Sequence, residues 1–156
     1  MAFTLRRGAG NVTEPVVVEL YASGTVRPGM VVEFSRTGGA GVGPASSSTT
    51  ITNIFGVCQD YAQGASDVKV RVIPILPGQI WEADTVNAVN TNQIGLRQRL
   101  YGSNSVLLAN DSYNSSGATG VFFIWDISSA TSGSGKVLGE FVRTPIQDQN
   151  ATLFHA

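Results

Sequence analysis

The sequence predicts an all-β protein, a small β-barrel or sandwich of about eight short strands with at most one short helix. The first observation is composition, because Val and Gly occur 18 times each, twice as often as Leu. Val suits pleated, half-buried surfaces, since its branched side chain is stiff at χ1. The second is spacing, because apolar segments recur every 8–15 residues with Gly-, Ser- or Pro-rich turns between them. At 156 residues we expect one domain.

The strands are predicted from β-branched residues and alternation. In the first half of the chain they span 15–21, 30–34, 51–58 and 67–75. The last of these alternates most cleanly, with its valines on one face and Lys69, Arg71 and Ile73 on the other. In the second half the strands span 96–101, 105–109, 121–127 and 136–143. Segment 121–127 is the strongest apolar run, and we expect a central strand buried on both faces or nearly so.

Two Pro-Gly turns punctuate this pattern. Segments 26–33 and 75–82 share the form apolar-x-Pro-Gly-x-[Val/Ile]-x-Glu. Pro-Gly fits a type II turn, because glycine accepts a positive φ at the second central position. Each turn is expected to start a strand with one inward residue, Val31 or Ile80. We interpret the similarity as repeated use of one turn, with a barrel of two similar halves as the alternative.

The remaining segments set the expected domain limits. Residues 1–14 form an N-terminal arm or a frayed terminus, 15–145 a single β-barrel domain, and 146–156 a C-terminal tail. A short helix is predicted to start after Asp84 or Thr85 and to stop at Gly95. The long Gly- and Ser-rich stretch 35–50 is predicted to be a loop, either a contact loop or a flexible flap.

The composition excludes several classes of protein. Charged residues make up only 13% of the chain, with two Lys, one His and one Cys. A disulfide within the chain is therefore impossible, and a zinc site lacks ligands. We expect Cys58 to be a small buried side chain. So few Lys make nucleic-acid binding by charge a poor expectation. No apolar run approaches the roughly 20 residues of a membrane span, and nothing marks export.

The sequence also contains few side chains in patterns that are typical of catalytic sites. The one histidine, His155, stands one residue from the end of the sequence, and no Gly-x-Ser-x-Gly motif occurs. The acid pairs that a glycosidase would use, Glu82 with Asp84 or Asp126 with Glu140, have no supporting motif. We therefore predict a non-enzyme with no catalytic residues, no cofactor, no metal and no small-molecule substrate. A small hydrolase that uses one of these acid pairs is the alternative.

The chain resembles the capsid decoration, or cement, proteins of tailed bacteriophages. The resemblance rests on the charge-poor composition, on segments 26–34 and 76–84, and on segment 120–126 followed by a Ser/Gly stretch and a last strand. It implies a compact β-barrel, often a homotrimer, bound to major capsid protein on the outside of the virion capsid. Its role would be to stabilise contacts between capsid subunits, with no nucleic acid or membrane as partner, after synthesis in the host cytoplasm.

The resemblance also implies contact residues, because a terminal arm often reaches onto the capsid in such proteins. Here Phe3 and Leu5 would anchor the arm, and Arg6 and Arg7 would meet acids. A second candidate comes from the residues themselves. Arg97 and Arg99 are expected to share one strand face, which either meets carboxylates of a partner or is simply solvated.

Two alternative functions follow from the same sequence. One is another virion component, from the tail, neck or fibre. The other is a carbohydrate-binding β module, in which exposed aromatic rings line a sugar groove. The aromatic candidates for that groove are Tyr61, Trp81, Tyr101 and Tyr113.

Overall fold

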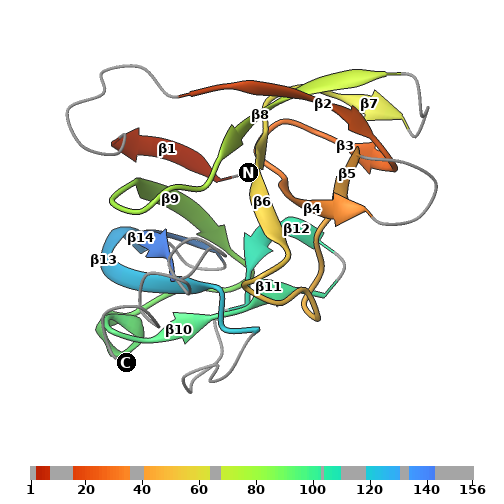
Figure 1. Cartoon of the computed structure of the whole chain (residues 1–156). Coiled ribbons are helices and arrows are strands. Elements are labelled where there is room, and N and C mark those ends of the chain that lie inside the picture. The colour runs from red at the N-terminus through yellow and green to blue at the C-terminus, as the bar shows by residue number, and fades with distance from the viewer. Residues whose placement is uncertain are drawn as a thin grey trace, which may run out of the picture.

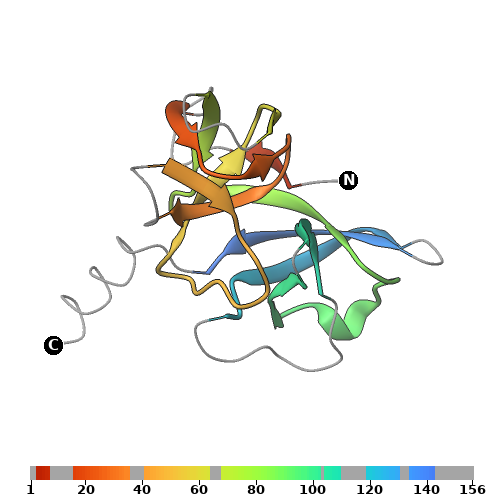
Figure 2. The ribbon, with the colours of Figure 1, turned by 90° about the vertical axis from the view of Figure 1, so that its right-hand side faces the viewer.

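A computed structural model confirms the all-β class and describes residues 3–7, 16–35, 41–63, 68–102, 104–109, 119–130 and 134–142. Within these ranges the chain forms a closed five-stranded barrel, a seven-stranded sheet and a two-stranded sheet (Figure 1). The barrel and the large sheet lie as two layers (Figure 2). Fourteen strands occur within these ranges, more than the predicted eight, because several of them are only two residues long.

The barrel is closed in the order β2-β5-β4-β6-β8. These strands are β2 (Val18–Ala22), β5 (Gly41–Pro44), β4 (Val31–Ser35), β6 (Ile54–Cys58) and β8 (Lys69–Pro74). Strands β2 and β5 are parallel, and the other pairs are antiparallel. Valines fill the interior, and Cys58 is buried among them as predicted.

The large sheet has the order β10-β13-β14-β9-β12-β11, with β1 also paired to β9. Its strands are β10 (Arg97–Gln98), β13 (Phe122–Ala130), β14 (Gly135–Phe141), β9 (Ile80–Thr85), β12 (Asn104–Leu108), β11 (Leu100–Tyr101) and β1 (Thr4–Arg7). The two-stranded sheet pairs β3 (Thr25–Val26) with β7 (Ala62–Gln63).

A second hydrophobic core joins the barrel to the large sheet. It contains Trp81, Phe122 and Phe141 from the sheet together with Val31 and Ile73 from the barrel. The rings of Phe122 and Phe141 meet edge to face with centroids 5.2 Å apart, an arrangement that aromatic pairs prefer. Ile73 is thus buried, although alternation places it on the polar side of β8, because the outer wall of the barrel packs on the sheet at that point.

Both Pro-Gly turns adopt the predicted backbone. Gly29 has φ 81° and Gly78 has φ 86°, as the second central glycine of a type II turn requires. The strands that follow differ, however. Val31 points into the joining core as expected, whereas Trp81 rather than Ile80 does so in the second case. The expectation for Ile80 was therefore wrong by one residue, which is enough to exchange the two faces of a strand.

Two local expectations need correction. Residues 41–44 form strand β5 inside the predicted loop 35–50, because a side chain at Gly41 would collide with the backbone of Tyr21 and its absence lets the two strands approach. The predicted short helix is a 3₁₀ helix, η1 (Thr91–Gln93), and its N-cap is Asn90 rather than Asp84 or Thr85. Those two residues belong to strand β9.

Strand β14 packs so closely on β13 that it needs a glycine at its middle. A Cβ on Gly139 would lie well inside van der Waals contact with the carbonyl oxygen of Phe123 and with the Phe122 ring. We predict that Gly139→Ala lowers the free energy of unfolding by about 2–3 kcal/mol, as overpacking of a core does. Urea denaturation followed by tryptophan fluorescence measures the change.

Gly43→Ala is the matched control, because its Cβ would lie 3.0 Å from the rotatable Ser23 hydroxyl and 3.8 Å, an ordinary contact distance, from the Ser23 carbonyl oxygen. We expect a loss below about 1 kcal/mol for this variant. Equal losses for the two variants would show that the close packing of β13 and β14 is not a constraint on the fold.

Candidate functional site

The large sheet presents a second face, opposite its core face, which we call the outer face. Strand β14 shows the division most simply. Gly135, Val137, Gly139 and Phe141 are buried, while the residues between them are half-exposed. Residues directly opposite each other in neighbouring strands share a face. The ladder therefore extends the outer face from Lys136, Leu138 and Glu140 to the strands on either side.

Two rows of side chains cross this face. In the first row Arg97 of β10 is opposite Phe123 of β13, which in turn is opposite Glu140 of β14. In the second row Leu138 is opposite Glu82 of β9. The outer face thus carries an apolar region over β13 and β14, and buried acids over β9.

A β-bulge in β13 exposes the largest side chain of this face. The register shifts between Ile124 and Asp126, so that Trp125 and Asp126 both stay outside and Ile127 returns to the core. Trp125 is 55% exposed, and its ring lies 6.0 Å from that of Phe123 at 81°. The expectation that 121–127 is buried on both faces was therefore wrong for this residue, because a bulge leaves no signal in an unbroken apolar run.

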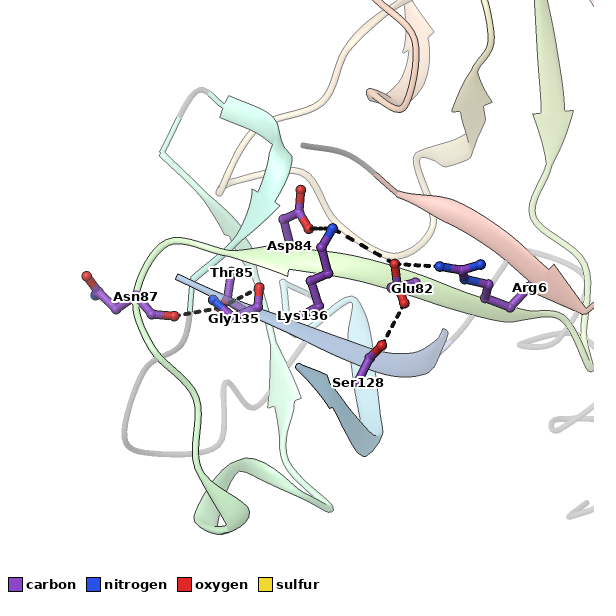
Figure 3. Close-up of polar contacts among 8 residues, drawn as sticks. All are labelled: Arg6, Glu82, Asp84, Thr85, Asn87, Ser128, Gly135 and Lys136. Carbon is purple, nitrogen blue, oxygen red and sulfur yellow. Dashed lines mark hydrogen bonds and ion pairs between the residues drawn. The ribbon is translucent and has the colours of Figure 1, made fainter. Parts of the chain in front are cut away.

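Strand β9 places two acids on the outer face, and both are nearly buried. Glu82 is 8% exposed and Asp84 is 5% exposed. Arg6 Nη2 lies 2.8 Å from Glu82 Oε1, and the Ser128 hydroxyl donates to Glu82 Oε2 at 2.7 Å (Figure 3). Lys136 Nζ lies 2.8 Å from Asp84 Oδ1 and 3.9 Å from Glu82 Oε1. We call these five residues the ionic network.

The contacts of the ionic network favour the ionised form of Glu82. The hydrogen bond from Ser128 and the pairing with Arg6 hold the pKa of Glu82 below its usual value. A general acid at neutral pH needs the opposite shift. Asp84 is likewise paired with Lys136, so both carboxylates link β9 to its neighbouring strands.

The other acid pair, Asp126 and Glu140, lies on the neighbouring strands β13 and β14. Asp126 accepts a hydrogen bond from the backbone N–H of Ile127. Glu140 lies one row away, opposite Phe123, and its partial burial raises its pKa. Among the residues that the structure describes, no group of three or more His, Cys, Asp or Glu is placed to hold a metal ion.

The predicted arm residues divide between the two faces. Strand β1 pairs with β9 of the same chain, and Phe3 is 2% exposed in the joining core, with ring centroids 5.3 Å from Phe141. Leu5 is opposite Trp81 and also packs on that core. The expectation that Phe3 and Leu5 anchor an arm on a neighbouring molecule is therefore not met, because the chain's own sheet holds them.

The predicted arginines are also separated. Arg6 belongs to the ionic network, and Arg7 is opposite Ile80 at the edge of the outer face. Arg97 stands at the opposite edge and donates from Nε and Nη2 to the carbonyl of Gly120, at 3.0 and 2.8 Å.

Arg99 does not share a stripe with Arg97, because the chain leaves β10 between them. It lines a separate pocket of about 320 Å³ together with Tyr101 and Asn87. This pocket contains no residue of the outer face.

The aromatic groove suggested by the sequence is not formed. Trp81 is 1% exposed and lies in the joining core. Tyr61 and Tyr101 are exposed but come from different parts of the fold, the first next to β7 and the second from β11. Tyr113 lies outside the described residues. A carbohydrate site built on these rings is therefore contradicted at Trp81.

The sequence matches no model of a known protein family, and no curated protein matches it. Within the described ranges, no helix is long and apolar enough to cross a membrane.

From the ionic network we predict that the difference in stability between the unaltered protein and the variant Glu82→Gln depends on pH. Glu82→Gln retains an oxygen that accepts from Ser128 but removes the charge that faces Arg6 and Lys136. We expect a loss of about 1–2 kcal/mol in the free energy of unfolding at pH 7. Because the pKa of Glu82 is lowered on folding, its contribution is present above the unfolded carboxyl value and is lost as pH falls through the folded value.

Urea denaturation of both proteins between pH 7 and pH 2 measures the difference. The two stabilities should converge in the acid range. A constant difference over the whole range would contradict an ionic contribution from Glu82, and Glu19→Gln serves as the control for an exposed acid of the barrel.

Proposed function

We propose that this chain is a bacteriophage capsid decoration protein that binds the outer surface of the capsid and stabilises contacts between major capsid subunits. The observation that supports the proposal best is the outer face. It is a sheet surface on which the exposed Trp125 packs beside the partly buried Phe123, between a basic edge at Arg7 and another at Arg97.

An exposed tryptophan on a paired strand is well suited to protein binding. Aromatic residues and Arg dominate the binding energy of protein interfaces, because they bury large areas at little conformational cost. The edge-on contact with Phe123 restricts the Trp125 ring before binding. Little ordering entropy is then lost when a partner covers the ring.

The charges of the outer face suit a partner with exposed acids. Arg6 and Lys136 form ion pairs with Glu82 and Asp84. Arg7, in contrast, is exposed and forms no ion pair within the described part of the chain. It is therefore the residue of this edge that is left to meet a carboxylate on the capsid.

The proposed assembly follows from the same resemblance. In a homotrimer, three outer faces engage one capsid together, and the individually weak contacts add through their high effective concentration. Each rigid copy then links neighbouring capsid subunits, on the virion exterior. No catalytic step is part of this function, because the buried acids of the outer face are used in ion pairs.

Trp125 provides the direct test of this function. We expect Trp125→Ala to weaken binding to expanded capsids of the source phage by about 30-fold, the effect of removing an interface hot spot. Co-sedimentation of the purified protein with capsids over a concentration series measures the affinity. Tyr61→Ala is the matched control, since Tyr61 is also exposed but lies outside the outer face. Full binding by Trp125→Ala, or binding to tails and not to capsids, would overturn the proposal.

A charge reversal tests the basic edge separately. We expect Arg7→Glu to lower capsid affinity about tenfold at low salt, and the loss should shrink as salt screens the interaction. Arg27→Glu, at an exposed turn position of the barrel, should bind like the unaltered protein. If both variants lose affinity equally, the effect is one of net charge, and Arg7 has no specific role in the contact.

A further inference from the structure

One carboxylate stands in the middle of a row of side chains that crosses the outer face. Glu140 of β14 is directly opposite Phe123 of β13, and Arg97 of β10 lies beyond Phe123. On the other side, the register between β14 and β9, continued by one residue, places Ile80 opposite Glu140. Ile80 is in turn opposite Arg7 of β1. The row therefore runs from one basic edge of the face to the other, with Glu140 between two apolar side chains.

The surroundings of Glu140 are apolar and only partly open to water. Phe123, Ile80 and Leu138 are each half-buried, as is Glu140 itself. Leu138 lies two positions before Glu140 on the same side of β14. Burial raises the pKa of Glu140, and no charge of the described chain offsets this effect. The Glu140 carboxylate forms no hydrogen bond or ion pair with any residue of the chain.

The two acids of β9 show what a covered carboxylate requires on this face. Glu82 and Asp84 are nearly buried, and each has a cation 2.8 Å away, from Arg6 and Lys136 respectively. Glu140 has no such cation and keeps part of its hydration instead. A partner that covers the outer face removes this water, and a carboxylate buried without a counter-charge is costly. The partner must therefore bring the cation.

We propose that Glu140 receives an arginine side chain of the partner that covers the outer face. This inference rests on the proposed function, in which that partner is the major capsid protein. A guanidinium group donates two parallel hydrogen bonds to one carboxylate, and its flat face packs on aromatic rings, whereas an ammonium group does neither as well. The ring of Phe123 stands opposite Glu140, and the ring of Trp125 is 6.0 Å from that of Phe123. The arginine would be the central charged contact, inside the acids that meet the basic edges.

A titration of the full chain with a capped tripeptide, leucine-arginine-leucine, tests this contact without capsids. At millimolar peptide we expect the amide chemical shifts of Phe123, Leu138 and Glu140 to change. The same tripeptide with citrulline in place of arginine has nearly the same shape but no charge, and it should bind at least about tenfold more weakly. Glu140→Gln should bind the arginine peptide as weakly as the citrulline peptide. Glu19→Gln, which removes an exposed acid of the barrel, is the matched control and should bind fully.

Several results of this titration would overturn the proposal. They are the absence of shifts at the three amides, equal binding of the citrulline peptide, and full affinity in Glu140→Gln. Equal binding of a leucine-lysine-leucine peptide would also overturn it, because the planar fork of the guanidinium group would then have no role.

Co-sedimentation with capsids separates this inference from the proposed function. If a capsid arginine pairs with Glu140, the variant Glu140→Gln should bind capsids about tenfold more weakly than the unaltered protein. If the partner covers Glu140 without a cation, the same variant should bind more tightly, because no charge is then buried. Tighter binding would overturn the inference, while a loss of affinity in Trp125→Ala would still support the proposed function. If the unaltered protein binds no capsids, the proposed function fails, and the peptide titration still decides whether the outer face selects arginine.

Discussion

Burial of strand β9 on both of its faces is the constraint on which this structure depends. Its odd-numbered side chains, Trp81 and Ala83, enter the core between sheet and barrel, while Glu82 and Asp84 are almost covered on the other side. Buried carboxylates are costly unless they are paired and hydrogen-bonded. The neighbouring strands supply what β9 requires, Arg6 from β1 and Lys136 from β14. The pairing of β9 with β1 and β14 therefore also neutralises the two acids of β9.

This requirement also determines what the outer face has left for other molecules. Arg6 and Lys136 form ion pairs within the chain, and Arg97 donates to the Gly120 carbonyl. The capsid contact that we propose would therefore rest mainly on apolar area. A chain with only 13% charged residues has little else to offer. The bulge in β13 supplies the apolar area, because it turns Trp125 outward without withdrawing Ile127 from the core.

Local signals predicted the local features well. The Pro-Gly pairs specified positive φ at Gly29 and Gly78, and the alternation of β8 placed Val70 and Val72 inside the barrel. Contacts between distant residues were beyond such signals. Arg6 and Glu82 are 76 positions apart, and no local pattern around either residue predicts their contact. The bulge at Trp125 and the strand at 41–44 were missed for a related reason, since each depends on how the segment fits against a neighbouring strand.

The position of Phe3 has a consequence for the order in which the chain acquires its structure. Its ring contacts Phe122 of β13 and Phe141 of β14, so Phe3 reaches its final packing only when both of these strands are in place. The barrel strands, in contrast, all lie between residues 18 and 74. During synthesis all the barrel strands are therefore made before β14. Phe3 can take its place in the core only after β14 has been made. Folding of the sheet is consequently dominated by contacts between residues that are far apart in the sequence, which is a slow class of folding reaction.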